Sequence, residues 1–207
     1  MGVAERGGRL NLQAIYLTRV PIVNPQLTTL PDERAQLAAE GRRLYQLWLG
    51  REGAGEVEAW LAARMADGQG QGDVLADLLA MLAGEMLRLH GAGRDEQQRF
   101  LADRSREWEA AIDSLAGREA IRNYAAGDFA RFVAAVKRNA RILARAGIDL
   151  DRDRDYHRLE INFNDSLSAL GDLRQQIARS DELIDRAVYL PLERGGGGGG
   201  GGGPTDC

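Results

Sequence analysis

The sequence predicts an all-α protein: an elongated antiparallel helical bundle with a long C-terminal helix and a short extended segment at its N-terminus. Two observations support this prediction. Apolar residues recur at helical spacing over most of the chain. Near the C-terminus a large apolar residue stands at every seventh position: Tyr156, Phe163, Leu170, Ile177 and Ile184. An unbroken seven-residue repeat indicates a long helix that packs lengthwise against another helix.

Residues 1–30 are predicted to form an extended segment. Apolar residues between positions 11 and 30 are interleaved with polar ones, and Pro21 and Pro25 oppose a helix there. Because a lone strand is not stable in water, we expect this segment to pair with another part of a larger protein or to lie along the helices.

The first helix is predicted over residues 31–49. Pro31 suits the first turn, and the carboxylates of Asp32 and Glu33 suit the positive end of the helix dipole. Glycines at positions 50, 53 and 55 end this helix, and a short second helix is expected from Glu56 to Ala66.

A leucine-rich stripe predicts the next helix over residues 73–90, with Asp73 as its cap. Gly91 and Gly93 then predict a break or kink, because each glycine in a helix is about 1 kcal/mol less favourable than alanine. The helix is expected to resume over residues 94–116. The three tryptophans and the leucine stripe are predicted to be core: Trp48, Trp60 and Trp108.

Residues 117–127 are predicted to be a connector, and Asp128 to cap a helix that ends at Gly147. After a charged loop, the last helix is expected over residues 155–189, which spans roughly 50 Å. Its partner is then the pair of helices 73–90 and 94–116. The helical bundle is predicted to occupy residues 31–190, since Pro191 disfavours further helix.

Residues 191–207 are predicted to be a disordered tail that contains nine consecutive glycines, Gly195 to Gly203. The single cysteine, Cys207, allows no disulfide within the chain, and no apolar run approaches the length of a membrane span. We therefore expect a cytoplasmic protein that has no membrane partner.

The sequence carries no pattern of catalytic residues and no zinc-binding cluster, so neither catalytic nor metal-binding residues are predicted. Four acids match positions one, three, five and twelve of a calcium-binding loop: Asp149, Asp151, Asp153 and Glu160. Arg154 stands at position six, where such a loop requires glycine. A solvated loop before a helix is the favoured interpretation.

The formal net charge of −4 makes the whole chain a poor binder of nucleic acid, unless one face is basic. Seven basic residues lie between positions 118 and 145, against two acidic ones. The candidate DNA-binding residues are Arg118, Arg122, Lys137, Arg138, Arg141 and Arg145. Lys137, Arg141 and Arg145 are four apart, which predicts one helix face. A solvated outer face and pairing with acids elsewhere in the bundle are the alternatives.

Four blocks of short motifs follow one another between residues 15 and 190. They are Arg19-Val20-Pro21-Ile22 with Pro31-Asp32-Glu33-Arg34; Gly72-Asp73-Val74-Leu75 with Gly84-Glu85-Met86-Leu87; Ile112-Asp113-Ser114-Leu115 with Ile121-Arg122-Asn123-Tyr124; and Lys137-Arg138-Asn139 with Asp181-Glu182-Leu183-Ile184-Asp185-Arg186-Ala187-Val188-Tyr189. In this order they resemble the C-terminal region of large bacterial adenine-specific DNA methyltransferases, including fused type II restriction–modification enzymes.

The resemblance implies a non-catalytic C-terminal module that supports DNA contact or domain packing. The glycine-rich methyl-donor motif and the Asn-Pro-Pro-Tyr catalytic motif of that family do not occur here. S-adenosylmethionine is thus expected only in a full-length parent or partner, and the implied partners are DNA and a methyltransferase or nuclease subunit. We also expect a truncation or frame change near residue 190. The alternatives are a helical protein–protein interaction module with no DNA role and a free-standing enzyme.

Overall fold

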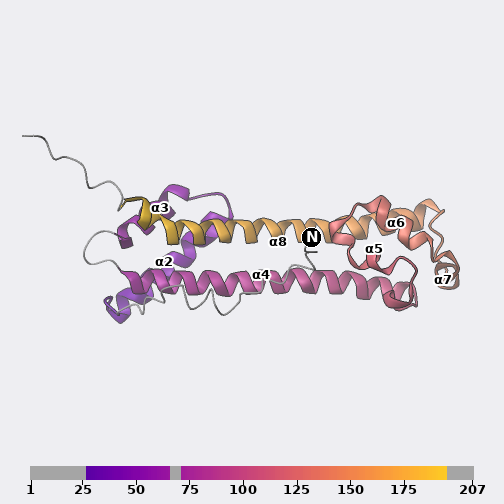
Figure 1. Ribbon diagram of the computed structural model, residues 1–207, viewed down its shortest axis with the longest axis horizontal. Coiled ribbons are helices and arrows are strands. Elements are labelled where there is room, and N and C mark those ends of the chain that lie inside the picture. Colours follow the sequence, from indigo (N-terminus) through magenta and orange to yellow (C-terminus); the bar gives the residue numbers. More distant parts are fainter. Residues whose placement is uncertain (1–26, 66–70, 195–207) are drawn as a thin grey trace, which may run out of the picture.

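The computed structural model describes residues 27–65 and 71–194, in which all regular secondary structure is helical. Two long helices, α4 (Gly72–Glu107) and α8 (Asp153–Arg194), run antiparallel along the length of the molecule (Figure 1). The prediction of an elongated antiparallel all-α bundle is confirmed. The extended segment predicted before residue 27 and the glycine tail from residue 195 lie outside the described residues.

Shorter helices cover the two ends of this hairpin (Figure 1). At one end lie α2 (Pro31–Leu49) and α3 (Ala54–Met65), which we call the proximal lobe. At the other end residues 108–152 form the distal lobe, whose helices are α5 (Arg118–Arg122), α6 (Phe129–Lys137) and α7 (Ala140–Arg145). Each lobe has its own hydrophobic core against the long helices. Trp48 and Trp60 are buried in the proximal core and Trp108 in the distal core, as predicted.

Helix α4 is continuous, so the predicted break at Gly91 and Gly93 is wrong. Leu89 and Phe100 on either side of the glycines are buried, and their burial outweighs the poor helix propensity of the two glycines. The helix also ends at Glu107, earlier than residue 116, because the chain turns at the buried Trp108.

Helix α8 packs lengthwise on α4 as predicted, but its buried stripe differs from the seven-residue repeat. The fully buried positions are Leu159, Phe163, Ser166, Leu170, Ser180, Leu183 and Ala187. Tyr156, the first member of the repeat, is 36% exposed, and Val188 near the end of the helix is 43% exposed. An α-helix has 3.6 residues per turn, so a strict seven-residue repeat drifts off the contact face over many turns.

The predicted limits of α8 are also wrong at both ends, because the helix begins at Asp153 and continues to Arg194. Pro191 lies within its last turns. Proline has no N–H to donate to the carbonyl four residues earlier, so the last turns of the helix lack that hydrogen bond.

Two buried serines of α8 each accept a hydrogen bond from a tyrosine, and the two tyrosines belong to different lobes. The Tyr124 hydroxyl of the distal lobe donates to Ser166 Oγ at 2.7 Å, and Ser166 Oγ donates to Glu96 Oε1 of α4 at 2.8 Å. Tyr45 of the proximal lobe donates to Ser180 Oγ at 2.8 Å. These bonds fix the register of each lobe on the hairpin, since an unpaired buried hydroxyl is costly.

At the C-terminal end of α2, helices α2 and α8 form reciprocal hydrogen bonds. The Arg179 guanidinium donates to the carbonyl oxygens of Trp48 and Leu49, which have no partner within their own helix. In return Trp48 Nε1 donates to the Arg179 carbonyl at 2.8 Å. Among the helices of residues 27–65 and 71–194, none is long and apolar enough to cross a membrane.

Asp73 joins the start of α4 to the segment before α2. Its fully buried carboxylate accepts hydrogen bonds from the Thr29 amide at 3.0 Å, the Thr29 hydroxyl at 2.8 Å and the Val74 amide at 3.0 Å. The helix begins at Gly72, so Asp73 lies in its first turn rather than at the predicted cap position. Burial raises the pKa of Asp73, but the hydrogen bonds from Thr29 and Val74 outweigh burial and leave the pKa below its usual value.

We therefore expect the free energy of unfolding of Asp73→Asn to fall less steeply than that of the parent protein as the pH is lowered into the acid range. A carboxylate with a lowered folded-state pKa stabilises the fold above its unfolded pKa of about 3.9, and this contribution is lost as pH falls through the folded pKa. Asp73→Asn should cost about 1–2 kcal/mol at pH 7, with the difference from the parent shrinking below about pH 4. Urea unfolding at a series of pH values measures this, with the exposed Asp32→Asn as control. A constant difference between the two profiles would contradict the account.

Candidate nucleic-acid interface

The most basic part of the described chain is the stretch 129–148 of the distal lobe, which contains α6 and α7. It holds five basic residues and no acidic one. All five side chains are exposed: Arg131, Lys137, Arg138, Arg141 and Arg145. This stretch is therefore a local cationic surface on a chain whose net charge is negative.

The prediction of one helix from residue 128 to Gly147 is wrong, because Asn139 separates α6 from α7. The buried Asn139 side chain holds the backbone of Ala116: Oδ1 accepts from its amide at 2.8 Å, and Nδ2 donates to its carbonyl at 3.0 Å. Nδ2 also donates to the Ala135 carbonyl at 3.1 Å. A spacing of four residues places side chains on one face only within a continuous helix. Because α6 ends before Asn139, this argument no longer joins Lys137 to Arg141 and Arg145.

Gly117 permits this contact between Ala116 and Asn139. Its φ of 74° lies in the left-handed region, and a Cβ there would come within 3.2 Å of the Ala135 Cβ. Asp128 caps α6 as predicted, with its carboxylate accepting from the Arg131 amide at 2.7 Å. The two short helices are thus anchored by side-chain to backbone bonds at both of their starts.

Lys137 is engaged by an acid. Its ammonium donates to Asp151 Oδ1 at 2.7 Å, and this hydrogen bond raises the pKa of Lys137 above its usual value. Lys137 therefore stays charged, but Asp151 balances that charge. Asp149, from the same calcium-like loop, accepts from the Asp151 amide at 3.1 Å and pairs with Arg152 at 3.2 Å.

Asp149 and Asp151 thus serve turns and ion pairs. Asp155, at the start of α8, likewise accepts from the Asp149 amide at 3.0 Å. Within residues 27–65 and 71–194, no group of three or more His, Cys, Asp or Glu side chains is arranged to hold a metal ion.

Arg118 and Arg122, two further candidates, are also engaged locally. Arg122 forms an ion pair with Asp113 and lies 3.5 Å from a Glu119 carboxylate oxygen. Arg118 donates to the Asp113 carbonyl at 3.2 Å and lies 3.9 Å from a Glu119 carboxylate oxygen. The alternative of pairing with acids therefore describes Arg118, Arg122 and Lys137.

Four arginines differ from these three. Arg131, Arg138, Arg141 and Arg145 are exposed, and their guanidinium groups make no ion pair or hydrogen bond with the part of the chain that the structure describes. Arg131 was not among the predicted site residues. It was counted in the basic segment, but only the structure separates it from the paired residues.

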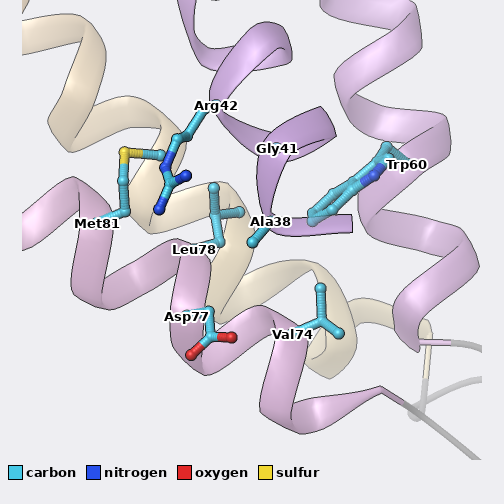
Figure 2. Close-up of a pocket in the computed structure, with 8 residues that line it drawn as sticks. All are labelled: Ala38, Gly41, Arg42, Trp60, Val74, Asp77, Leu78 and Met81. Carbon is cyan, nitrogen blue, oxygen red and sulfur yellow. The ribbon is translucent and has the colours of Figure 1, made fainter. Parts of the chain in front are cut away.

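Two hollows of the described residues show no arrangement of catalytic side chains. One, of about 630 Å³, lies beside α7 and is lined by Lys137, Leu143, Ile148 and Asp151, among others. The other, of about 400 Å³, lies between α2, α3 and α4 (Figure 2). Its lining is mixed: Trp60, Val74, Leu78 and Met81 are apolar, Arg42 and Asp77 are charged, and Asp77 is held by Arg34 through bonds of 2.6 and 2.7 Å.

Neither hollow brings a nucleophile together with a base. The basic surface of α6 and α7 is therefore the best-defined candidate site in the described residues. Comparison with models of protein families, with curated proteins and with solved structures gave no significant match.

Proposed function

We propose that this chain is a non-catalytic module of a restriction–modification adenine-specific DNA methyltransferase, and that its distal lobe contacts the DNA backbone. The observation that carries the DNA contact is a set of four exposed arginines that pair with no acid among residues 27–65 and 71–194: Arg131, Arg138, Arg141 and Arg145. Guanidinium groups match the geometry of phosphate and keep their charge at any physiological pH. The motif resemblance supports the methyltransferase setting.

The shape of the molecule supports different roles for the two lobes. The hairpin holds the distal lobe far from α2 and α3 (Figure 1). The distal lobe carries eight basic and six acidic residues, whereas residues 27–65 carry five basic and six acidic ones, so backbone phosphates are attracted more strongly to the distal lobe than to the proximal lobe. The proximal lobe is then left to pack against the rest of the assembly. S-adenosylmethionine would be bound by a parent or partner chain.

The Asn139 contacts support binding by a preformed surface. Arg138 and Arg141 stand on either side of Asn139, which holds the junction of α6 and α7 on Ala116. Side chains on an anchored backbone lose less entropy on binding than those on a mobile tail. Phosphate contact carries no sequence information, so this surface would position the module rather than select a site.

We expect Arg138→Ala/Arg141→Ala to weaken binding to a short fluorescent DNA duplex roughly tenfold at low salt, since each exposed charge contact contributes up to about 1 kcal/mol. Fluorescence anisotropy measures this affinity. The matched control is Arg42→Ala/Arg94→Ala, which removes two exposed arginines outside the distal lobe that have no ion pair among the described residues.

The control should leave DNA affinity nearly unchanged. Equal losses in the two double variants would show that only total charge matters, and would contradict a specific surface. Absence of binding by the parent protein at low salt would remove the DNA role altogether.

A further inference from the structure

The middle of the hairpin differs from both of its ends. On α4, Leu89 is the one fully buried apolar residue between Leu82 of the proximal core and Phe100 of the distal core. On α8, the apolar residues between Leu170 and Leu183 are at most partly buried. We call this middle stretch, residues 86–95 of α4 and 171–177 of α8, the waist. We infer that the waist is a hinge about which the two lobes bend relative to each other.

Glycines stand in both helices at the same level of the waist. Glu96 of α4 meets Ser166 of α8 in a hydrogen bond of 2.8 Å. Gly91 precedes Glu96 by five residues, and Gly171 follows Ser166 by five residues. Because the helices are antiparallel and rise equally per residue, Gly91 and Gly171 lie at one level, with Gly93 close by.

Packing does not require these glycines. A Cβ added at Gly91, Gly93 or Gly171 would meet no atom within 4 Å. Their effect is therefore on the helices themselves, since glycine weakens a helix more than any residue except proline. Glycines in both long helices at one level lower the cost of bending there.

Few supports of the two lobes reach this level. From the proximal side, the last hydrogen-bonded anchor is Arg179, which binds the end of α2. From the distal side, one bond crosses the level: Arg174, three residues beyond Gly171, donates to the Ala125 carbonyl at 3.1 Å, and this contact is exposed to solvent. A section with few buried contacts between two well-packed ends is where a hinge is expected. Bending there would turn the basic surface of the distal lobe relative to the proximal lobe.

This inference is independent of the proposed DNA contact, and its test needs no ligand. Spin labels are placed at exposed positions of the two lobes with Ala39→Cys and Ala134→Cys, in a background carrying Cys207→Ser. Pulsed dipolar spectroscopy then gives the distribution of distances between the lobes. The test variant is Gly91→Ala/Gly93→Ala/Gly171→Ala, whose added methyl groups occupy open space.

The triple variant is expected to narrow the distance distribution. It should also slow amide hydrogen exchange in the waist, by roughly fivefold for each substitution. Gly84→Ala is the matched control: a Cβ there also meets no atom within 4 Å, but Gly84 lies at the level of Arg179, where α2 supports the hairpin. Gly84→Ala should leave the width of the distance distribution unchanged. A parent distribution as narrow as that of the triple variant would overturn the hinge.

Discussion

Phe163→Ala is expected to lower the free energy of unfolding by about 3–5 kcal/mol. Phe163 of α8 is 1% exposed and is the centre of the distal core. Its ring centroid lies 6.5 Å from that of Phe100, 5.8 Å from Tyr124, 5.2 Å from Phe129 and 5.1 Å from Phe132. Truncation therefore removes contacts with α4, with the segment after α5 and with α6, and leaves a cavity that these helices cannot all close.

Urea unfolding followed by circular dichroism measures this loss. The control is Ile161→Ala, two residues earlier on the same helix, where the side chain is 46% exposed. That change should alter the free energy of unfolding by less than about 0.5 kcal/mol beyond its small effect on helix propensity. Similar losses in both variants would mean that Phe163 does not occupy the buried position described.

Asn139→Ala is expected to cost about 2–3 kcal/mol in stability and to weaken DNA binding as well. Four hydrogen bonds are lost: one from the Ala116 amide and three to the carbonyls of Ala116, Ala135 and Val136. The junction of α6 and α7 then loosens. Arg138 and Arg141 are no longer held in one arrangement, although neither is changed.

This prediction separates the anchoring of the basic surface from its charge, because Asn139→Ala leaves the charge of the lobe unaltered. Chemical unfolding gives the stability, and anisotropy with the same duplex gives the affinity under conditions where the variant is folded. Asn123→Ala is the control, since Asn123 is an exposed asparagine of the same lobe. Undiminished affinity in a clearly destabilised Asn139→Ala would show that the surface needs no fixed geometry.

Much of the fold could be predicted because its signals are local. Pro31 and the acids after it place the start of α2 correctly, and the repeat of apolar residues shows that the last helix packs lengthwise. The errors lie where distant contacts override local preference. Burial of Leu89 and Phe100 carries α4 through two glycines.

The junction at Asn139 shows the same limit for the candidate site. An asparagine within a run of helix-forming residues gives no sign that its side chain will bind Ala116, which lies 23 positions earlier. The pairing of Lys137 with Asp151 likewise depends on how the loop after α7 folds back. The sequence could therefore locate the basic segment, but only the structure separates the paired residues from the four that remain open to a ligand.

The central claim is that these four arginines bind the phosphate backbone, and the salt dependence of DNA affinity tests it most directly. Release of counterions by four contacts predicts that the logarithm of affinity falls with the logarithm of salt concentration with a slope of about −3.6, roughly 100-fold between 50 and 200 mM salt. Replacing Arg131, Arg138, Arg141 and Arg145 by alanine should abolish most of this slope. A slope that stays the same in the fourfold variant, or an affinity of the parent that does not depend on salt, would contradict the account.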